Sequence, residues 1–115
     1  MAIERFEDLK CWRAARELCR KIYSVSQEGN FSRDFTLCEQ MRRAAISAVS
    51  NIADGFDSGS EREFLRFLRY SQRSCSEIRA QLYVALDQGY LEPKESGLSA
   101  PSSITTYHVL STKGP

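Results

Sequence analysis

The sequence has few of the residues that build enzymes, metal sites or membrane spans. Its 115 residues include one histidine and three prolines, and sixteen basic against fifteen acidic side chains leave a net charge of +1. This balance excludes a polycationic tail protein, so any affinity for nucleic acid has to come from the local charge pattern. No stretch approaches the roughly 18 consecutive apolar residues of a transmembrane helix, and the N-terminus lacks the apolar segment of a signal peptide. We therefore expect a cytoplasmic protein with no membrane partner.

The cysteines are too few and too widely spaced for a disulfide framework or a zinc site. They are Cys11, Cys19, Cys38 and Cys75, and the last three fall at apolar positions of helical patterns. A reduced thiol at such a position behaves as a small buried hydrophobic group. The only histidine, His108, lies near the C-terminus. We predict no catalytic residue, no metal, no cofactor and no small-molecule substrate.

Apolar residues instead repeat with the 3.6-residue period of amphipathic helices. The pattern predicts helices at about residues 7–27, 34–54 and 60–88. The expected buried stripes contain Leu9, Trp12, Ala15, Leu18, Cys19, Ile22 and Val25 in the first helix, Cys38, Met41, Ala45, Ala48, Val49 and Ile52 in the second, and Phe64, Leu68, Ser71, Cys75, Ile78, Leu82 and Leu86 in the third. The apolar fraction of 42% suffices for one domain with one modest core and excludes two independent domains.

The ends of these segments carry capping residues. Ser60 begins a capping-box pattern that opens the third helix, and Gly89 fits its C-terminal end. The second helix has two candidate N-caps, Ser32 and Asp34, between which the sequence does not choose. The glycine-rich residues 55–59 are predicted to break the chain between the second and third helices.

The composition changes after residue 91. The last 24 residues hold all three prolines and five serines, and no helical period is sustained there. The chain therefore divides into a helical-bundle domain at residues 1–91 and a C-terminal segment at residues 92–115. Residues 104–110 fit either a weak strand or one side of a short helix. The predicted fold class is all-α, an antiparallel up-and-down bundle of three long helices with a short or irregular fourth segment.

Arginine outnumbers lysine by twelve to four, a bias that favours bidentate contacts to phosphate or carboxylate. Four arginines lie on the side of the third helix opposite its apolar stripe, within about 40° of the first of them. They are Arg62, Arg66, Arg69 and Arg73. A second row, in the first helix, consists of Arg13, Arg16 and Arg20. We predict that the two rows bind the backbone of RNA or DNA; the alternative is a solvated face in which nearby glutamates pair with the arginines.

Four other side chains bear on function. Trp12 lies on the apolar stripe and is predicted to belong to the core, which leaves Tyr70 and Tyr83 as candidate surface or interface aromatics. Asn51, beside a core position of the second helix, is expected to hydrogen-bond to a partner between helices.

Residues 40–56, QMRRAAISAVSNIADGF, carry a resemblance to a known family. Further similarities are Phe6-Glu7-Asp8-Leu9 with Trp12 and Ala15, Glu63-Phe64 with Phe67-Leu68, and Arg73-Ser74-x-Ser76-Glu77. Over about residues 6–91 the sequence resembles the bacterial four-helix-bundle proteins first noticed as open reading frames in intervening sequences of 23S ribosomal RNA genes, sometimes described as ribosomal-protein-like. These proteins are related to the accessory protein of diversity-generating retroelements.

The resemblance implies an antiparallel bundle that assembles as a homopentamer and a relation to proteins that work with nucleic acid and a reverse transcriptase. It implies no enzymatic activity. Family members continue into a fourth amphipathic helix, whereas this chain has EPKESG at residues 92–97. Asp54 and Glu77 fall within the similar motifs, and we expect them to pair with Arg42, Arg43 or backbone donors rather than to act as acids or bases.

The function expected from these observations is that of a non-catalytic homo-oligomer, a pentamer by resemblance, which touches RNA or DNA through its arginine rows. The alternative is a scaffold that binds protein partners and no nucleic acid.

Overall fold

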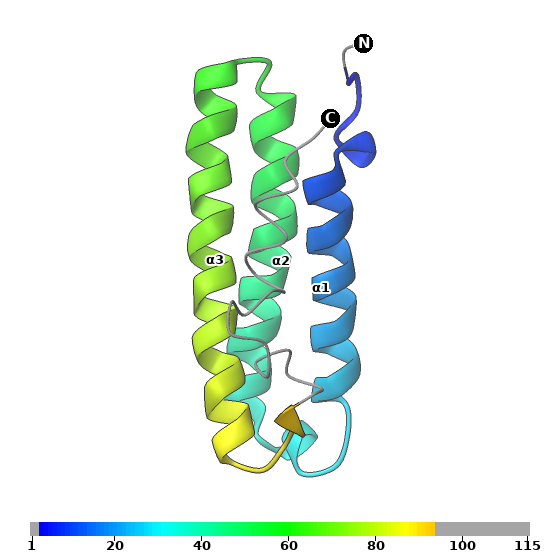
Figure 1. The fold of residues 1–115 in the computed structure, drawn as a ribbon, viewed down its shortest axis with the longest axis vertical. Helices are drawn as coiled ribbons and strands as arrows, with labels where there is room; N and C mark the ends of the chain where they lie inside the picture. The colour runs from blue at the N-terminus through cyan, green and yellow to red at the C-terminus, as the bar shows by residue number, and fades with distance from the viewer. Residues whose placement is uncertain (1–2, 94–115) are drawn as a thin grey trace.

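A computed structural model of the chain describes residues 3–93 and contains three long helices (Figure 1). These are α1 (Lys10–Ser26), α2 (Phe35–Asp57) and α3 (Glu61–Asp87), accompanied by two single turns of 3-10 helix, η1 (Phe6–Asp8) and η2 (Phe31–Arg33). The predicted all-α class is confirmed, with no strand among residues 3–93. The interpretations of residues 94–115, including the strand or helix at 104–110, lie outside the described residues.

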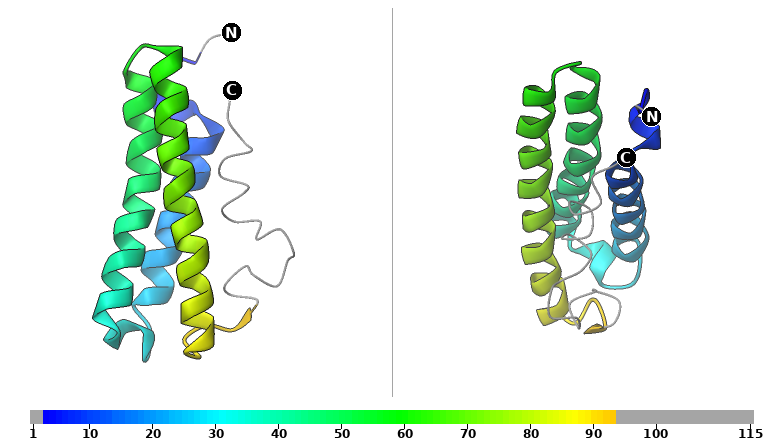
Figure 2. Two further views of the ribbon diagram at one scale, coloured as in Figure 1. Left: turned by 90° about the vertical axis from the view of Figure 1, so that its left-hand side faces the viewer. Right: turned by 45° about the horizontal axis from the view of Figure 1, so that its top comes forward.

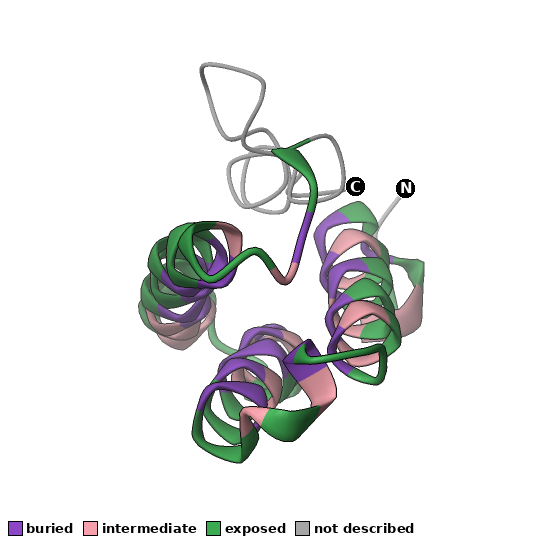
Figure 3. Ribbon diagram, turned by 90° about the horizontal axis from the view of Figure 1, so that it is seen from below, coloured by how far each residue is buried: buried purple, intermediate pink, exposed green. Residues whose placement is uncertain are grey.

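Helix α2 is the central element of the bundle. It packs against α1 on one side and against α3 on the other, and the chain runs up and down through the three (Figures 1 and 2). Seen along the helix axes, the buried sides of all three point toward a common interior (Figure 3). The side of each helix that faces away from this interior is exposed.

Small residues allow α2 and α3 to approach closely. Ala44 and Ala48 of α2 are buried, and so is Gly55, two residues before the end of the helix. A Cβ atom on Gly55 would lie 2.6 Å from the Cβ of Phe67 and 3.2 Å from a ring carbon of Phe64. The glycine is therefore required by the helix crossing.

This contact corrects the predicted break at residues 55–59. Helix α2 continues through Gly55 to Asp57, and the turn occupies residues 58–60, where Gly59 has a φ of +73°. Gly55 costs some helical propensity, but its missing side chain gives room to Phe67, so packing outweighs propensity at this position.

Serine hydroxyls complete the contact between α2 and α3. Ser71 donates to the carbonyl oxygen of Ala48 at 2.9 Å, and Ser74 donates to the hydroxyl of Ser47 at 2.9 Å. Asn51 donates to the carbonyl and hydroxyl oxygens of Ser47 at 2.8 and 2.9 Å. We expected the Asn51 amide to hydrogen-bond to a partner between helices, and this is wrong, because its hydrogen bonds lie within α2. Its partner Ser47 makes the contact with α3 through Ser74.

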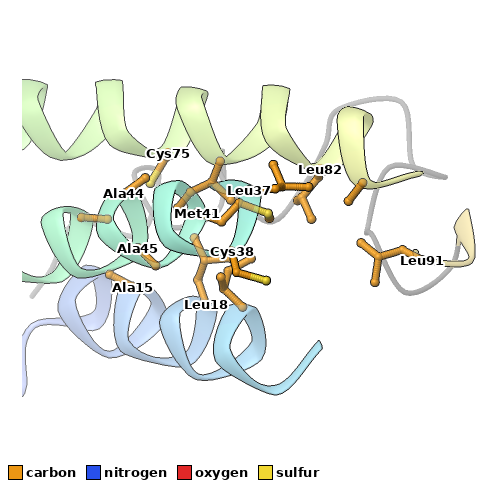
Figure 4. Packing of buried hydrophobic residues seen from close by; sticks show 14 of the residues in the cluster. Ala15, Leu18, Leu37, Cys38, Met41, Ala44, Ala45, Cys75, Leu82 and Leu91 are labelled. Atoms are coloured by element: carbon orange, nitrogen blue, oxygen red, sulfur yellow. The ribbon is translucent and has the colours of Figure 1, made fainter. Parts of the chain in front are cut away.

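The core is made of side chains from all three helices and from the segments that flank them. Figure 4 shows Leu18 of α1, Met41 of α2 and Leu82 of α3 directed into the space between the helices. Met41 is fully buried, and Leu82 is 5% exposed. Leu91 closes this core beyond the end of α3.

The buried stripe of α1 differs from the predicted one by a rotation toward its neighbour α2. Its fully buried positions are Cys11, Ala15, Leu18, Ile22 and Ser26, whereas Trp12, Cys19 and Val25 are half-buried. The prediction that Trp12 belongs to the core holds in part: the half-buried indole packs against the core at its edge, 5.1 Å from the ring of Phe6. A periodic pattern cannot show on which side of its apolar stripe a helix meets its neighbours.

The predicted stripe of α3 needs a similar correction. Ser71, Cys75, Ile78 and Leu82 are buried as predicted, but Phe64, Leu68 and Leu86 are half-buried. Ser74, Gln81 and Ala85 are buried instead, and Ser74 meets α2 through its hydrogen bond to Ser47.

The observed caps decide the helix ends. Asp34 is the N-cap of α2, since its carboxylate accepts from the Leu37 amide at 3.2 Å, and Ser60 caps α3 by accepting from the Glu63 amide at 3.2 Å. Helix α1 begins at Lys10 rather than near residue 7, because Leu9 has an extended backbone with ψ of 130°.

The end of α3 is tied to the start of α2 through Tyr90. Its hydroxyl donates to Asp34 at 2.9 Å, and its ring stacks on Phe31 with centroids 5.1 Å apart. The hydrogen bond to the Asp34 carboxylate raises the pKa of the Tyr90 phenol, because the bond and the nearby negative charge both disfavour the phenolate.

We expect Leu82→Ala to lower the free energy of unfolding by about 2 to 5 kcal/mol, because a buried leucine is replaced by a cavity. Gln72 is exposed on the same helix, so Gln72→Ala is the control and should change stability by less than about 0.5 kcal/mol. Urea unfolding followed by circular dichroism measures both. Equal losses in the two variants would mean that Leu82 does not lie in the core.

We expect Gly55→Ala to destabilise the protein by about 1 to 3 kcal/mol, since the new methyl group meets the Cβ of Phe67 and forces the helices apart. Helix propensity alone predicts the opposite sign, a gain of about 1 kcal/mol. Ser50→Ala, at an exposed position of α2, is the control in which propensity acts without a clash. A stabilised Gly55→Ala protein in thermal unfolding would refute the close approach of α2 and α3.

Candidate nucleic-acid interface

The arginine row of α3 forms one exposed face of the molecule. Arg62, Arg66, Arg69 and Arg73 are all exposed, as the helical spacing predicts. Because the opposite side of α3 packs on α2, their guanidinium groups point away from the bundle interior. We call these four residues the α3 arginine face.

Two of these arginines are held beside Tyr70. The guanidinium carbon of Arg66 lies 5.7 Å from the centre of the Tyr70 ring, and that of Arg73 lies 5.8 Å from it. Tyr70 is half-buried against Phe67, whose ring centre is 5.5 Å away. The aromatic contacts orient both guanidinium groups while leaving their charge in place.

Acidic neighbours compensate this face only in part. Arg66 pairs with Glu63 at 2.7 Å, which is the predicted pairing of a glutamate with the row. Among residues 3–93, Arg62 and Arg69 take part in no ion pair. A hollow of about 590 Å³ lies among these side chains and Leu65. The face therefore keeps a net positive charge near the first half of α3.

The arginines of α1 do not extend the α3 arginine face. Helix α2 lies between α1 and α3, so the two rows occupy separate surfaces (Figure 3). Arg13 donates to the carbonyl oxygen of Glu7 at 2.9 Å and pairs with Asp8 at 3.3 Å, which fastens η1 to α1. Arg20 pairs with Glu17 at 3.3 Å. Arg16 lies over the Trp12 ring, 5.7 Å from its centre.

A groove between α1 and α2 contains residues that the sequence analysis did not single out as a site. Its larger hollow has a volume of about 760 Å³ and is lined in part by Tyr23, Phe35 and Arg42. Arg42 stacks on Tyr23 at 4.9 Å and donates from Nε to the hydroxyl of Ser26 at 2.9 Å. The only sequence signal for this arrangement is the Arg42-Arg43 pair, since Tyr23 and Phe35 join it solely through the packing of α1 on α2.

The carboxylates considered for acid-base chemistry stand apart from one another. Glu77 accepts from the Gln81 amide at 3.2 Å, and Arg43 pairs with Glu39 at 3.5 Å rather than with Asp54 or Glu77. Asp54 and Glu77 are both exposed. No shared cleft brings them together.

The four thiols all lie within the described part of the chain and are unbridged. Burial raises the pKa of the Cys75 thiol to about 11 and also raises the pKa of Cys19. Within residues 3–93 no group of three or more histidine, cysteine or acidic side chains is placed to hold a metal ion. Likewise, no helix described there has the length and apolar character needed to cross a membrane.

Comparison with known proteins decides the family. The sequence model of the 23S rRNA-intervening sequence protein family matches residues 7–104. The chain belongs to this family. The resemblance carried by residues 40–56 is thus confirmed, and the match continues past residue 91, beyond the point at which the C-terminal segment was expected to leave the family pattern. No curated protein matches the chain.

Proposed function

We propose that this 23S rRNA-intervening sequence protein is a non-catalytic, oligomeric binding protein that contacts the backbone of RNA or DNA through the α3 arginine face. The observation that carries the proposal is the set of four exposed arginines on one side of α3, two of them oriented by Tyr70. Guanidinium groups bind phosphate oxygens with paired hydrogen bonds, and helical residues in one row can follow a strand of phosphates.

The length of the row suits several phosphates. Arg62 and Arg73 are eleven residues apart, or about 16 Å along α3 at 1.5 Å per residue. That length corresponds to about five nucleotide steps of 3.4 Å in one strand of a duplex. Arginines spaced along a helix axis present no base-reading pattern of their own, so the binding should be electrostatic and weakly dependent on sequence.

A protein-binding scaffold is the second candidate function, because α3 also exposes apolar side chains. Leu65 is 50% exposed, Tyr83 48% and Val84 47%. Leu65 lies within the arginine row, whereas Tyr83 and Val84 lie beyond its C-terminal end. A second copy of the chain would remove them from water, and the resemblance to the family implies five copies.

Oligomerisation would also strengthen the binding of nucleic acid. A ring of five chains carries five copies of the α3 arginine face, that is, twenty guanidinium groups. The net charge of +1 per chain therefore does not prevent a strongly positive local surface. Neighbouring faces on one ring would act together on one long strand.

We expect the double substitution Arg66→Gln and Arg69→Gln to flatten the salt dependence of binding. Each phosphate contact contributes about 0.7 to 0.9 to the slope of log K against log salt, so two lost contacts should reduce the slope by about 1.4 to 1.8 for each chain engaged. The measurement is fluorescence anisotropy with structured RNA and duplex DNA between about 50 and 200 mM salt.

The control for charge is the double substitution Lys10→Gln and Arg79→Gln, which removes the same charge from exposed positions outside both arginine rows. Its slope should equal that of the wild type, and circular dichroism should show all three proteins folded. Absence of binding at low salt would leave the scaffold as the function. If the two double variants have equal salt slopes, the α3 arginine face does not contribute to nucleic-acid binding.

We expect the protein to sediment as an oligomer at micromolar concentration, because the exposed apolar residues of α3 are covered by a second chain. Five chains of 13.1 kDa give a mass near 66 kDa. Analytical ultracentrifugation that gives about 13 kDa contradicts self-association, whereas a dimer or tetramer contradicts only the number five.

A further inference from the structure

The groove between α1 and α2 is a second candidate site, on a surface separate from the α3 arginine face. Its two hollows have volumes of about 760 and 570 Å³ and are joined by lining residues that they share, Tyr23, Gln27 and Ile46. On α1 the lining extends from Arg16 to Gln27, about 16 Å along the helix axis. The groove is therefore elongated, as a site for a polymer is.

One guanidinium group in this groove is fixed in place. Arg42 is half-buried, its plane lies over Tyr23, and its Nε donates to Ser26. Within residues 3–93 no carboxylate forms an ion pair with it. Its Nη atoms, which that bond does not use, carry the donors that bind phosphate in pairs. Because the side chain is already ordered, less conformational entropy is lost when an anion binds.

The groove also offers an aromatic ring to solvent. Phe35 lines the larger hollow and is 78% exposed, the highest exposure among the large hydrophobic side chains of residues 3–93. Phe35 and Arg42 are seven residues apart on one side of α2, about 10 Å along the axis or three stacked nucleotide steps. An exposed ring on the same side of a helix as a fixed arginine is an arrangement with which proteins hold single strands.

The charge of the groove favours an anionic polymer. Arg16, Arg20, Arg42 and Arg43 line the two hollows. Arg20 and Arg43 have intrahelical acidic partners, in Glu17 and Glu39, and both pairs are exposed and therefore weak. Arg16 and Arg42 rest on aromatic rings instead. The groove thus combines cations along its length with an exposed aromatic ring, Phe35, at one end.

We propose that the groove between α1 and α2 binds single-stranded nucleic acid, with one base stacked on Phe35 and phosphates on Arg42 and the neighbouring arginines. This inference rests on the proposed function and adds to it a preference for unpaired bases. In a duplex the base faces are stacked on one another and do not reach Phe35, so only a single strand gains the aromatic contact. The α3 arginine face contacts phosphates in either form.

The test uses fluorescence anisotropy to compare the binding of two labelled probes. One is an oligouridylate of about twelve nucleotides, a length that the groove and its flanks can hold, and the other is a DNA duplex of equal length. Phe35→Ala should weaken binding of oligouridylate by about 5- to 100-fold, the loss expected for one stacked base, and leave duplex binding and its salt slope unchanged. Gln40→Ala, which shortens an exposed side chain of α2 that does not line the groove, should bind both probes as the wild type does.

A second variant tests the stacking itself. Phe35→Trp should retain binding, and its indole fluorescence should be quenched by oligouridylate and not by the duplex. The Arg66 and Arg69 double variant should lower the salt slope for both probes, which separates the two sites. If duplex and single strand bind the wild type but Phe35→Ala weakens neither, the groove site is refuted and the α3 arginine face stands.

Other results are equally decisive. If the wild type binds neither probe at low salt, both proposals fail. If Phe35→Ala abolishes self-association in the ultracentrifuge while its affinity for oligouridylate is unchanged, the groove is occupied by a second copy of the chain and the single-strand site is refuted.

Discussion

The close contact between α2 and α3 is the constraint on which the rest of the structure depends. It requires small residues at Ala44, Ala48 and Gly55, and it is completed by serine hydroxyls that satisfy one another or a backbone carbonyl across the helices. Because Gly55 has no side chain, Phe67 can pack directly against the backbone of α2. Every other element is positioned relative to this pair, since α1 packs on the remaining buried side of α2.

This arrangement of helices determines which surfaces are available to bind a ligand. A central α2 keeps the outer sides of α1 and α3 apart, so the two arginine rows lie on separate surfaces rather than in one basic patch. One surface is the row of exposed arginines on α3. The other is a groove in which Arg42 is ordered by Tyr23 and Ser26. A chain with almost no net charge thereby presents local sites suited to a polyanion.

Aromatic side chains have two different tasks in these surfaces. Tyr70 and Tyr23 are half-buried and orient guanidinium groups, and their contacts with arginine hold the cation without cancelling its charge. The Phe35 side chain is exposed to solvent over most of its surface. Aromatic residues usually indicate a core in a sequence, but their role here depends on their position in the fold. The position of Trp12 at the edge of the core is another example.

The sequence by itself determined the all-α class, the approximate helices, the cap at Ser60, the outward direction of the α3 arginines and the family, because these depend on local periodicity, local hydrogen bonds and a contiguous motif. Only the tertiary structure decided that α2 runs through Gly55, that Cys11 rather than Trp12 faces the interior, and that Tyr23, Phe35 and Arg42 share a groove. These features depend on which helix stands beside which. A residue pattern within one helix cannot specify the partner that fills the space next to a glycine or beside an arginine.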